Sequence, residues 1–279
     1  MNIIPITNQC NQNCLFCSAK GRKDQSGKEF FKRIINQAKD SLVISGGEPT
    51  LSKDLFWVIK KAKDKKLFVE LQTNGITCYY ERLANKLVNS GVDLFNINLP
   101  SHISSVHDKI TQTKGLLGKK IIGIKNLQEQ KANFRLTCII NSLNYKHLKD
   151  YVVFVNNNFP KVKYIQFSFI KIMGATKKNS KILISYEKVK PFLSEIFREC
   201  QKLNIEFIID HIPLCYLEEY RNYHIDYQKI SRDEKPEYSL QEKVKMLECK
   251  HCSWSSYCCG VRKDYLEHFG QKTKVYPIK

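Results

Sequence analysis

The sequence predicts an α/β fold, a partial (β/α)6 TIM-like barrel followed by a small cysteine-rich C-terminal domain. Strand-like apolar runs alternate with longer amphipathic stretches as far as about residue 210, which is typical of βα units around a parallel sheet. Beyond residue 211 this alternation stops, and five of the eleven cysteines follow. We therefore expect two domains, at residues 1–210 and 211–279.

Each predicted strand is a short apolar run that ends in a polar or glycine-containing turn. The first two, at residues 3–7 and 41–45, lead into a cysteine-rich loop and a Gly-Gly pair. Further strands are expected at residues 67–73, 93–99, 134–141, 163–170 and 205–209. Helices are expected at residues 30–39, 55–65, 81–90, 119–131, 148–157 and 187–203. Six βα units indicate an incomplete barrel, whose chemistry lies at the carboxyl ends of its strands.

Residues 221–240 break this pattern. They are polar, charged and rich in tyrosine, and they show no clear period. We expect them to cross the surface as a long connection.

The composition indicates a globular protein whose cysteines bind metal. With 279 residues, 42% of them hydrophobic, the chain can bury a sizeable core. No apolar run approaches the roughly 18 residues of a membrane helix, and the N-terminus lacks a signal-peptide pattern. We therefore expect a cytoplasmic protein with no membrane partner. In that compartment eleven cysteines are better explained as metal ligands and free thiols than as disulfides.

The net charge of +19 raises the question of a nucleic-acid partner. The 38 lysines far outnumber the 8 arginines, however, and no Arg-rich or aromatic-interleaved patch stands out. We therefore favour a scattered basic surface over a nucleic-acid interface.

The loop after the first strand carries three cysteines, Cys10, Cys14 and Cys17. Thiolates are the ligands that select iron–sulfur clusters or zinc, and no fourth cysteine or histidine lies nearby in the sequence to complete a structural zinc site. The same spacing also matches one face of a helix, on which the cysteines would be core residues. Three neighbouring asparagines favour a loop, and with it a metal site.

Two motifs in this order resemble the radical S-adenosylmethionine (radical SAM) enzymes. Cys10, Cys14 and Cys17 match the family's CxxxCxxC signature, with Phe16 before the third cysteine, and Ser45-Gly-Gly-Glu-Pro-Thr50 is similar to its second motif. The resemblance implies a [4Fe–4S] cluster with S-adenosylmethionine (SAM) at its open iron. It further implies reductive cleavage of SAM to a 5′-deoxyadenosyl radical, hydrogen abstraction from a substrate, and a flavodoxin or ferredoxin-type reductant.

The resemblance also suggests which residues contact SAM. It places Gly46, Gly47 and Glu48 at the amino group of SAM, and residues 165–174 in the segment that flanks adenine. Polar residues at the ends of other predicted strands are candidates for the same pocket, although each is equally well explained as a loop cap. These candidates are Asn74, Asn98, Ser101 and Asn141. His102 and His107 follow the fourth predicted strand and are candidates to face the substrate, but an exposed loop is the favoured expectation.

A second group of cysteines lies near the C-terminus and resembles the shortened auxiliary-cluster domains, of SPASM or twitch type, that follow many radical SAM barrels. The resemblance implies one auxiliary [4Fe–4S] cluster, with Cys259 as an alternate ligand beside Cys258. A four-cysteine zinc site is the other interpretation. The remaining cysteines, Cys78, Cys138 and Cys200, are expected to be packing residues. The ligands expected for the auxiliary cluster are Cys215, Cys249, Cys252 and Cys258.

For the substrate we expect a peptide or protein, because relatives with an auxiliary cluster commonly modify peptides. No recognisable peptide-binding domain precedes the first strand, which weakens this expectation. A small-molecule metabolite is the first alternative, and nucleic acid the second. A non-catalytic iron–sulfur or zinc-binding protein is the rival from another class, but the Gly46-Gly47 turn and the barrel periodicity argue against it.

Overall fold

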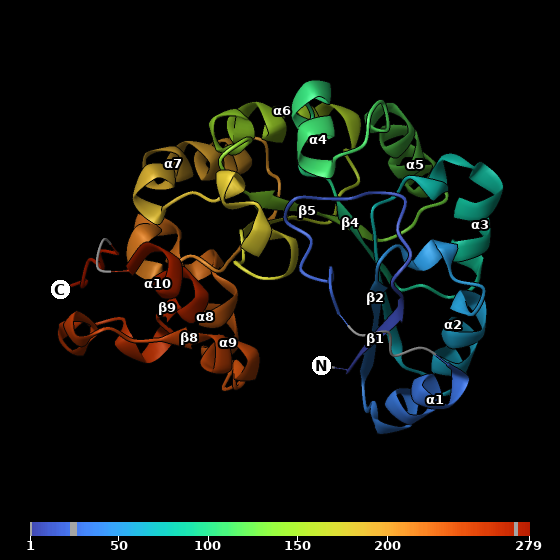
Figure 1. Ribbon diagram of the computed structural model, residues 1–279, viewed down its shortest axis with the longest axis horizontal. Coiled ribbons are helices and arrows are strands. Elements are labelled where there is room, and N and C mark those ends of the chain that lie inside the picture. Colours follow the sequence, from blue (N-terminus) through green and yellow to red (C-terminus); the bar gives the residue numbers. More distant parts are fainter. Residues whose placement is uncertain (1, 23–26, 271–272) are drawn as a thin grey trace.

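The computed structural model describes residues 2–22, 27–270 and 273–279. Its centre is a seven-stranded sheet in which every strand is parallel to its neighbours and the spatial order follows the sequence. The sheet curls into an open arc with helices along its outer side, so the predicted partial barrel is confirmed (Figure 1). The strands are β1 (Asn2–Thr7), β2 (Ser41–Gly46), β3 (Phe68–Thr73), β4 (Leu94–Asn98), β5 (Phe134–Ile140), β6 (Ile165–Phe169) and β7 (Phe207–Asp210).

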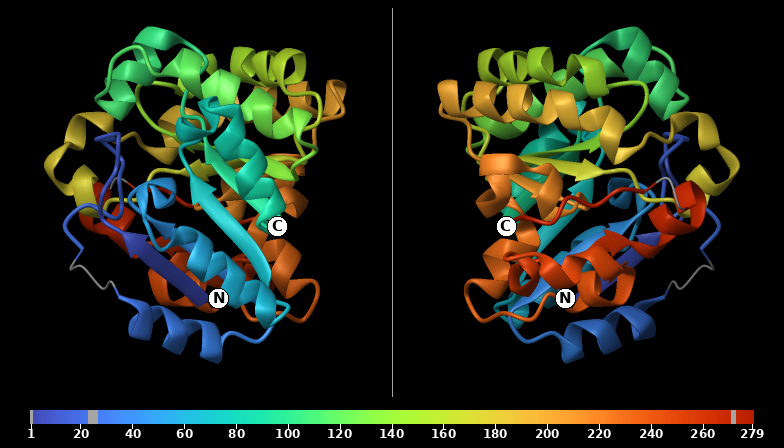
Figure 2. Two further views of the ribbon diagram at one scale, coloured as in Figure 1. Left: turned by 90° about the vertical axis from the view of Figure 1, so that its right-hand side faces the viewer. Right: turned by 90° about the vertical axis from the view of Figure 1, so that its left-hand side faces the viewer.

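The helices that connect these strands lie along the outside of the arc, as two side views also show (Figure 2). All six predicted helices are present, each within about two residues of its expected bounds. None of the described helices is both long and apolar enough to cross a membrane. The connecting helices are α1 (Lys28–Gln37), α2 (Leu55–Asp64), α3 (Glu81–Asn89), α4 (Ser104–Thr111), α5 (Leu117–Glu129), α6 (Leu148–Asn158) and α7 (Tyr186–Lys202).

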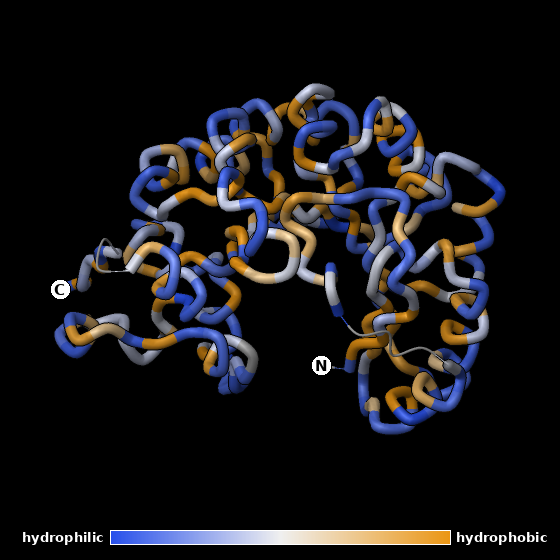
Figure 3. The backbone as a smooth tube through the Cα atoms, in the orientation of Figure 1, coloured by the Kyte–Doolittle hydropathy of each residue, from blue (hydrophilic) through white to orange (hydrophobic). Residues whose placement is uncertain are grey.

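The two faces of the sheet differ in polarity. On the outer face, side chains such as Leu71 and Ile97 are fully buried in the core shared with the helices, and hydrophobic residues are frequent along the strands (Figure 3). On the inner face Arg135 forms an ion pair with Glu70 (Nη2 to Oε1, 2.7 Å), and the amide of Asn96 donates to the same oxygen at 3.1 Å. Alternate residues of a strand face opposite sides of the sheet. The apolar side chains therefore lie on the outer face, and the polar side chains between them lie on the inner face.

The structure adds helix α4 to the predicted elements. Only Val106 and Ile110 of its eight residues are aliphatic, so the segment shows no strong helical period. Its buried residues include His107, which is fully buried and not on an exposed loop as expected. Helix α4 packs close to the loop after β1, as described below.

Residues 221–240 do not form the long irregular connection that we expected. They contain helix α8 (Ile225–Ile230) and the start of α9 (Glu237–Glu242). Polar contacts hold these short helices: His224 Nδ1 accepts a hydrogen bond from the backbone N–H of Asp226, and the buried Asp226 carboxylate contacts the ammonium of Lys243. Because buried ion pairs produce no hydrophobic period in the sequence, the hydrophobic pattern did not predict these helices.

The C-terminal region packs against the last strands and α7. Its two-stranded antiparallel sheet pairs β8 (Lys243–Val244) with β9 (Val261–Arg262), and α10 (Lys263–Phe269) follows. Tyr265 of α10 stacks on Tyr186 of α7 with ring centroids 3.8 Å apart. β7 ends at Asp210, and the proposed division of the chain after this residue stays a prediction.

Candidate functional site

The three cysteines of the N-terminal region lie on an irregular loop. Residues 8–22 contain no helix, so the helix-face alternative is wrong. The end of α4 holds the loop: the backbone N–H groups of Asn13 and Leu15 donate to the carbonyls of Thr111 and Ile110 at 3.0 and 2.9 Å. Cys10 is exposed, whereas Cys14 and Cys17 are partly buried. We call residues 8–22 the cysteine loop.

A glycine turn after β2 packs directly on the cysteine loop. The backbone N–H of Gly47 donates to the carbonyl of Thr7 at 2.6 Å, and that of Glu48 donates to Gln9 at 2.7 Å. A Cβ atom on Gly47 would lie 2.1 Å from the carbonyl oxygen of Gln9, and Gly46 has a φ of 127°. Side chains at these two positions would push the loop away, which explains the Gly-Gly pair.

Glu48 ties this turn to the end of β3. It is fully buried, and its carboxylate accepts hydrogen bonds from the hydroxyls of Thr50 and Thr73 at 2.6 and 2.7 Å. The same carboxylate accepts the backbone N–H of Asn74 at 2.7 Å. The side chain thus fixes two adjacent strand ends relative to each other. The predicted contact of Gly46, Gly47 and Glu48 with SAM stays a prediction.

Asn74 connects the end of β3 to the cysteine loop itself. Its side-chain amide donates to Asn11 Oδ1 at 2.6 Å and lies 3.9 Å from the sulfur of Cys10. The backbone N–H of Gln12 also points at this sulfur, at 3.4 Å. N–H groups directed at a thiolate stabilise its negative charge, which is the environment that iron–sulfur ligation uses.

The other polar candidates lie at the same edge of the sheet and make local bonds. The amide of Asn98 donates to the carbonyl of Thr137 at 3.3 Å. Ser101 Oγ accepts the backbone N–H of Ile103 just before α4, and Asn141 Oδ1 accepts that of Leu143, both at 3.0 Å. The bonds of Ser101 and Asn141 are the loop caps that the sequence left open as an alternative, whereas the bond of Asn98 crosses to β5. A SAM contact for Asn98, Ser101 or Asn141 stays a prediction.

Lys120 is a residue of this site that the sequence reasoning did not identify. It lies on α5, is fully buried, and donates to the backbone carbonyl of Asn98 at 2.9 Å. Burial lowers the pKa of its ammonium to about 8, while the charges of Cys14, Glu48 and Cys10 act to raise it. A buried cation therefore lies beside the cysteine loop. The signal was in the sequence: Leu117, Lys120 and Ile124 have the spacing of one buried helix face.

The three thiols lie within electrostatic reach of one another. Burial raises the pKa of Cys14 to about 12; the charge of Lys120 opposes this, and the charges of Cys10 and Cys17 add to it. Burial also raises the pKa of Cys10, to which Glu48 and Cys17 contribute. Three thiolates so close repel one another, and a cationic metal centre relieves that repulsion. The donor set therefore fits an iron–sulfur cluster with three cysteine ligands.

The C-terminal cysteines gather around a separate cavity. Cys215, Cys249, Cys252 and Cys258 all line about 410 Å³ of space, including the part that opens to solvent. The rest of the lining includes apolar residues such as Leu214, Val261 and Ile278. Four thiols that line one cavity are a donor set that fits a sulfide-bridged cluster. Their role as ligands, and the choice between iron and zinc, stay predictions.

The remaining cysteines differ from these seven. Cys78, Cys138 and Cys200 are fully buried in the core, as packing residues would be. Cys259 is buried beside Asp226 and is absent from the lining of the C-terminal cavity. In the parts of the chain that the structure describes, no group of three or more His, Cys, Asp or Glu side chains is arranged to hold a single metal ion.

Comparisons with known proteins connect this site to an enzyme family. The family model described as Radical SAM superfamily matches residues 4–155, which include most of β1, the cysteine loop and the strands β2 to β5. A probable GTP 3′,8-cyclase of Methanocaldococcus jannaschii is 30% identical over 214 residues, covering 72% of this chain and 67% of that protein. A GTP 3′,8-cyclase of Campylobacter jejuni is 30% identical over 191 residues, covering 64% of this chain and 58% of the relative.

Two solved structures share the fold at lower sequence identity. Native anSMEcpe with bound AdoMet superimposes with a TM-score of 0.69 at 17% identity, over 99% of this chain and 92% of that one. Streptococcus suis SuiB bound to its precursor peptide SuiA gives a TM-score of 0.63 at 20% identity. That match covers 77% of this chain and 48% of SuiB, so the chain spans about half the length of that protein.

Proposed function

Because the chain belongs to the radical SAM superfamily, we propose that it cleaves S-adenosylmethionine reductively and uses the resulting radical to remove hydrogen from a peptide or protein. Cys10, Cys14 and Cys17 would hold the [4Fe–4S] cluster, which leaves one iron for SAM. When bound, cluster and SAM supply the 5′-deoxyadenosyl radical, while the protein orients them and excludes water. The observation that carries the proposal is the cysteine loop fixed between the Gly46-Gly47 turn and Asn74.

Two further features beside the cysteine loop would help to bind SAM. Gly46 and Gly47 bring backbone close to the cysteine loop, where a ligand can be bound by carbonyl oxygens without side-chain interference. Lys120 supplies a buried positive charge beside Cys14, suited to the carboxylate of the methionine part of SAM. Asn98, Ser101 and Asn141 would contribute polar contacts from neighbouring strand ends.

For the C-terminal cavity we propose an auxiliary [4Fe–4S] cluster ligated by Cys215, Cys249, Cys252 and Cys258. Four thiolates occupy all four irons of such a cluster, which suits electron transfer better than direct substrate binding. A flavodoxin or ferredoxin-type protein would deliver electrons to the enzyme.

A peptide or protein substrate is supported by the fold of the whole chain. The likeness to anSMEcpe extends over both the barrel and the cysteine-rich region, and another structure of that protein holds a peptide with AdoMet. SuiB, which shares the fold, was solved with its precursor peptide. The alternative is a nucleotide, because the curated relatives are named GTP 3′,8-cyclases.

The SAM-cleaving activity is tested on anaerobically reconstituted protein with a strong reductant. We expect methionine and 5′-deoxyadenosine in equal amounts, and about eight iron atoms per chain if both clusters form. The variant Cys14→Ala should lose the cleavage and about half of the iron. The variant Cys78→Ala, which removes a core thiol, should keep both. Stoichiometric zinc at residues 10–17, with no SAM cleavage, would contradict the proposal.

The substrate class is tested with a lysate of source cells grown in heavy water, because carbon-bound deuterium then labels every candidate substrate. We expect deuterium to appear in 5′-deoxyadenosine when the peptide and protein fraction is supplied, and to disappear after that fraction is digested with protease. Transfer from the nucleotide fraction, or from added deuterated GTP, would favour the nucleotide alternative instead.

A further inference from the structure

The segment that follows β6 contacts the cysteine loop at Cys17. The backbone N–H of Ala175 donates to the carbonyl of Cys17 at 2.9 Å. Gly174 has a φ of 61°, and a Cβ atom there would lie 2.4 Å from the same carbonyl oxygen. Thr176 closes the segment into a turn, since its hydroxyl donates to the carbonyl of Lys171 at 2.9 Å. We call residues 171–176 the linking segment.

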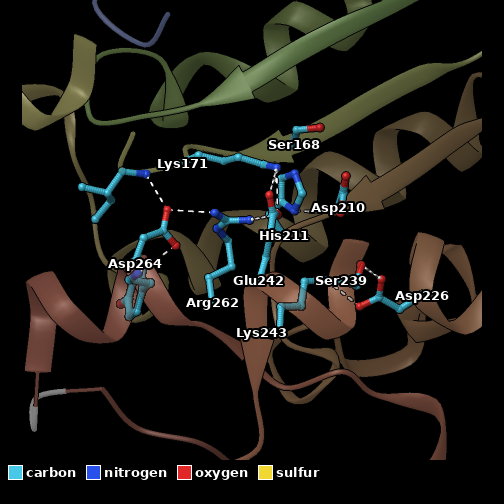
Figure 4. A network of polar contacts seen from close by, with 12 residues as sticks. Ser168, Lys171, Asp210, His211, Asp226, Ser239, Glu242, Lys243, Arg262 and Asp264 are labelled. Atoms are coloured by element: carbon cyan, nitrogen blue, oxygen red, sulfur yellow. Dashed lines mark hydrogen bonds and ion pairs between the residues drawn. The ribbon is translucent and has the colours of Figure 1, made fainter. Parts of the chain in front are cut away.

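The other end of the linking segment is held by the C-terminal region (Figure 4). The ammonium of Lys171 lies 2.9 and 3.2 Å from the two carboxylate oxygens of Glu242, at the end of α9. The backbone N–H of Ile172 donates to the carboxylate of Asp264, in α10, at 2.7 Å. One side-chain contact and one backbone contact thus fix two successive residues.

Arg262 of β9 holds the two carboxylates in place. Its guanidinium donates to Glu242 at 2.6 Å and to Asp264 at 2.8 Å, and its side chain is only 5% exposed. Arg262 thus bridges the two carboxylates with one nitrogen each, and such shielded, charge-assisted hydrogen bonds are stronger than ion pairs on an open surface. Arg262 directly follows Val261, which lines the cavity of the C-terminal cysteines. A continuous series of contacts therefore connects that cavity, through Arg262 and the linking segment, to Cys17.

We propose that Lys171, Glu242 and Asp264 are positioning residues for the cysteine loop. They fix the linking segment, and the linking segment fixes the carbonyl of Cys17. The C-terminal region would then help to set the geometry of the first cluster, although its own cysteines lie elsewhere. Since coupling between two sites is reciprocal, SAM bound at the cysteine loop would in turn stabilise the C-terminal region. This last consequence rests on the proposed function, whereas the positioning itself does not.

The positioning is tested by amide hydrogen exchange on the full chain without clusters. In Lys171→Met and Asp264→Asn we expect exchange in peptides covering residues 14–20 and 172–178 to become about 10-fold faster, within the range of typical coupling energies. Lys171→Arg, which keeps the positive charge, should retain the slow exchange of the unaltered protein. Lys178→Met, which removes an exposed lysine close to the linking segment, is the matched control and should resemble the unchanged protein.

Two results would overturn the positioning. Exchange in the 14–20 peptide that is unchanged in Lys171→Met would show that the linking segment does not hold Cys17. Exchange that rises equally throughout the chain, with a matching fall in melting temperature, would show a merely structural role.

The consequence for SAM is measured on reconstituted protein. We expect the KM for SAM to rise about 10-fold in Lys171→Met, with the iron content of the C-terminal site unchanged. An unchanged KM would refute the coupling to SAM. If the unaltered protein does not cleave SAM at all, the proposed function fails, and the exchange experiment still decides the positioning.

Discussion

Lys120 is the residue whose burial is hardest to explain without a ligand. Taking a lysine ammonium out of water is costly, and among the described residues its hydrogen-bond partner is the carbonyl of Asn98. The nearby thiols and Glu48 favour its charged form. An anionic group bound beside the cysteine loop would add to this compensation, and we propose that the carboxylate of SAM is that group.

We expect Lys120→Met to raise the KM for SAM about 10- to 100-fold, the effect of losing one charged hydrogen bond. Methionine keeps most of the side-chain volume, so the fold should be retained. Lys119→Met, an exposed neighbour, is the control. A KM for SAM that is the same in both variants would refute this role.

Two buried histidines predict an acid-sensitive fold. Burial, together with the charge of Lys120 for His107 and of Lys243 for His224, lowers the pKa of each to about 4. The unfolded chain takes up these protons near pH 6.5, whereas the folded chain resists them. The free energy of unfolding is therefore at its full value above about pH 6.5. It decreases as the pH falls toward 4, by up to roughly 3 kcal/mol per histidine.

Chemical denaturation at pH 7 and pH 5.5 measures this effect. The unaltered protein should lose more stability between these two pH values than His224→Gln does. A loss of the same size in both proteins would show that His224 is not responsible.

Single residues also mark the limit of sequence reasoning. The spacing of Cys10, Cys14 and Cys17 and the Gly46-Gly47 pair were visible in the sequence, because ligation and close backbone approach require those residue types. The bonds of Asn74 to Asn11 and Cys10 were not, since they depend on the distance between two loops that are remote in the chain.

At the scale of elements, the glycine turn after β2 has the strictest requirement for residues without a side chain. It packs against the cysteine loop through backbone atoms, which cannot move aside as a flexible side chain can. Ala at position 47 must therefore displace one of the two segments, at a cost of about 1–3 kcal/mol.

We expect Gly47→Ala to lower the iron content of the N-terminal site and to raise the KM for SAM. Gly118→Ala is the control, because a Cβ atom there meets no atom within 4 Å. Its effect on stability should be neutral or favourable by at most about 1 kcal/mol. Normal iron content and a normal KM in Gly47→Ala would show that the close contact is unnecessary.

The strands and long helices were predictable because their apolar residues repeat with the period of the element, as in β3 and α7. Helix α4 and residues 221–240 lacked such a period. Their order comes from polar contacts, such as the pair of Asp226 with Lys243, whose partners lie 17 residues apart. A local sequence pattern cannot predict a contact between residues so far apart in the chain.

At the scale of the whole molecule, the parallel sheet brings the candidate site together. Its strands all end at one edge, so loops after β1, β2, β3 and β6 meet although they are far apart in sequence. The C-terminal region continues the arc beyond β7, where Ile209 and His224 form a parallel bridge. The fold class could be predicted from the sequence, while the contact of the C-terminal region with the linking segment required the structure.

The central claim is that the cysteine loop holds a cluster with one iron open to SAM. The most direct measurement is electron–nuclear double resonance of the reduced, reconstituted protein with SAM that carries a magnetic isotope in its amino or carboxylate group. We predict a hyperfine coupling between cluster and label that Cys14→Ala abolishes. A cluster signal that SAM leaves unchanged, with no coupling to either label, would contradict the account.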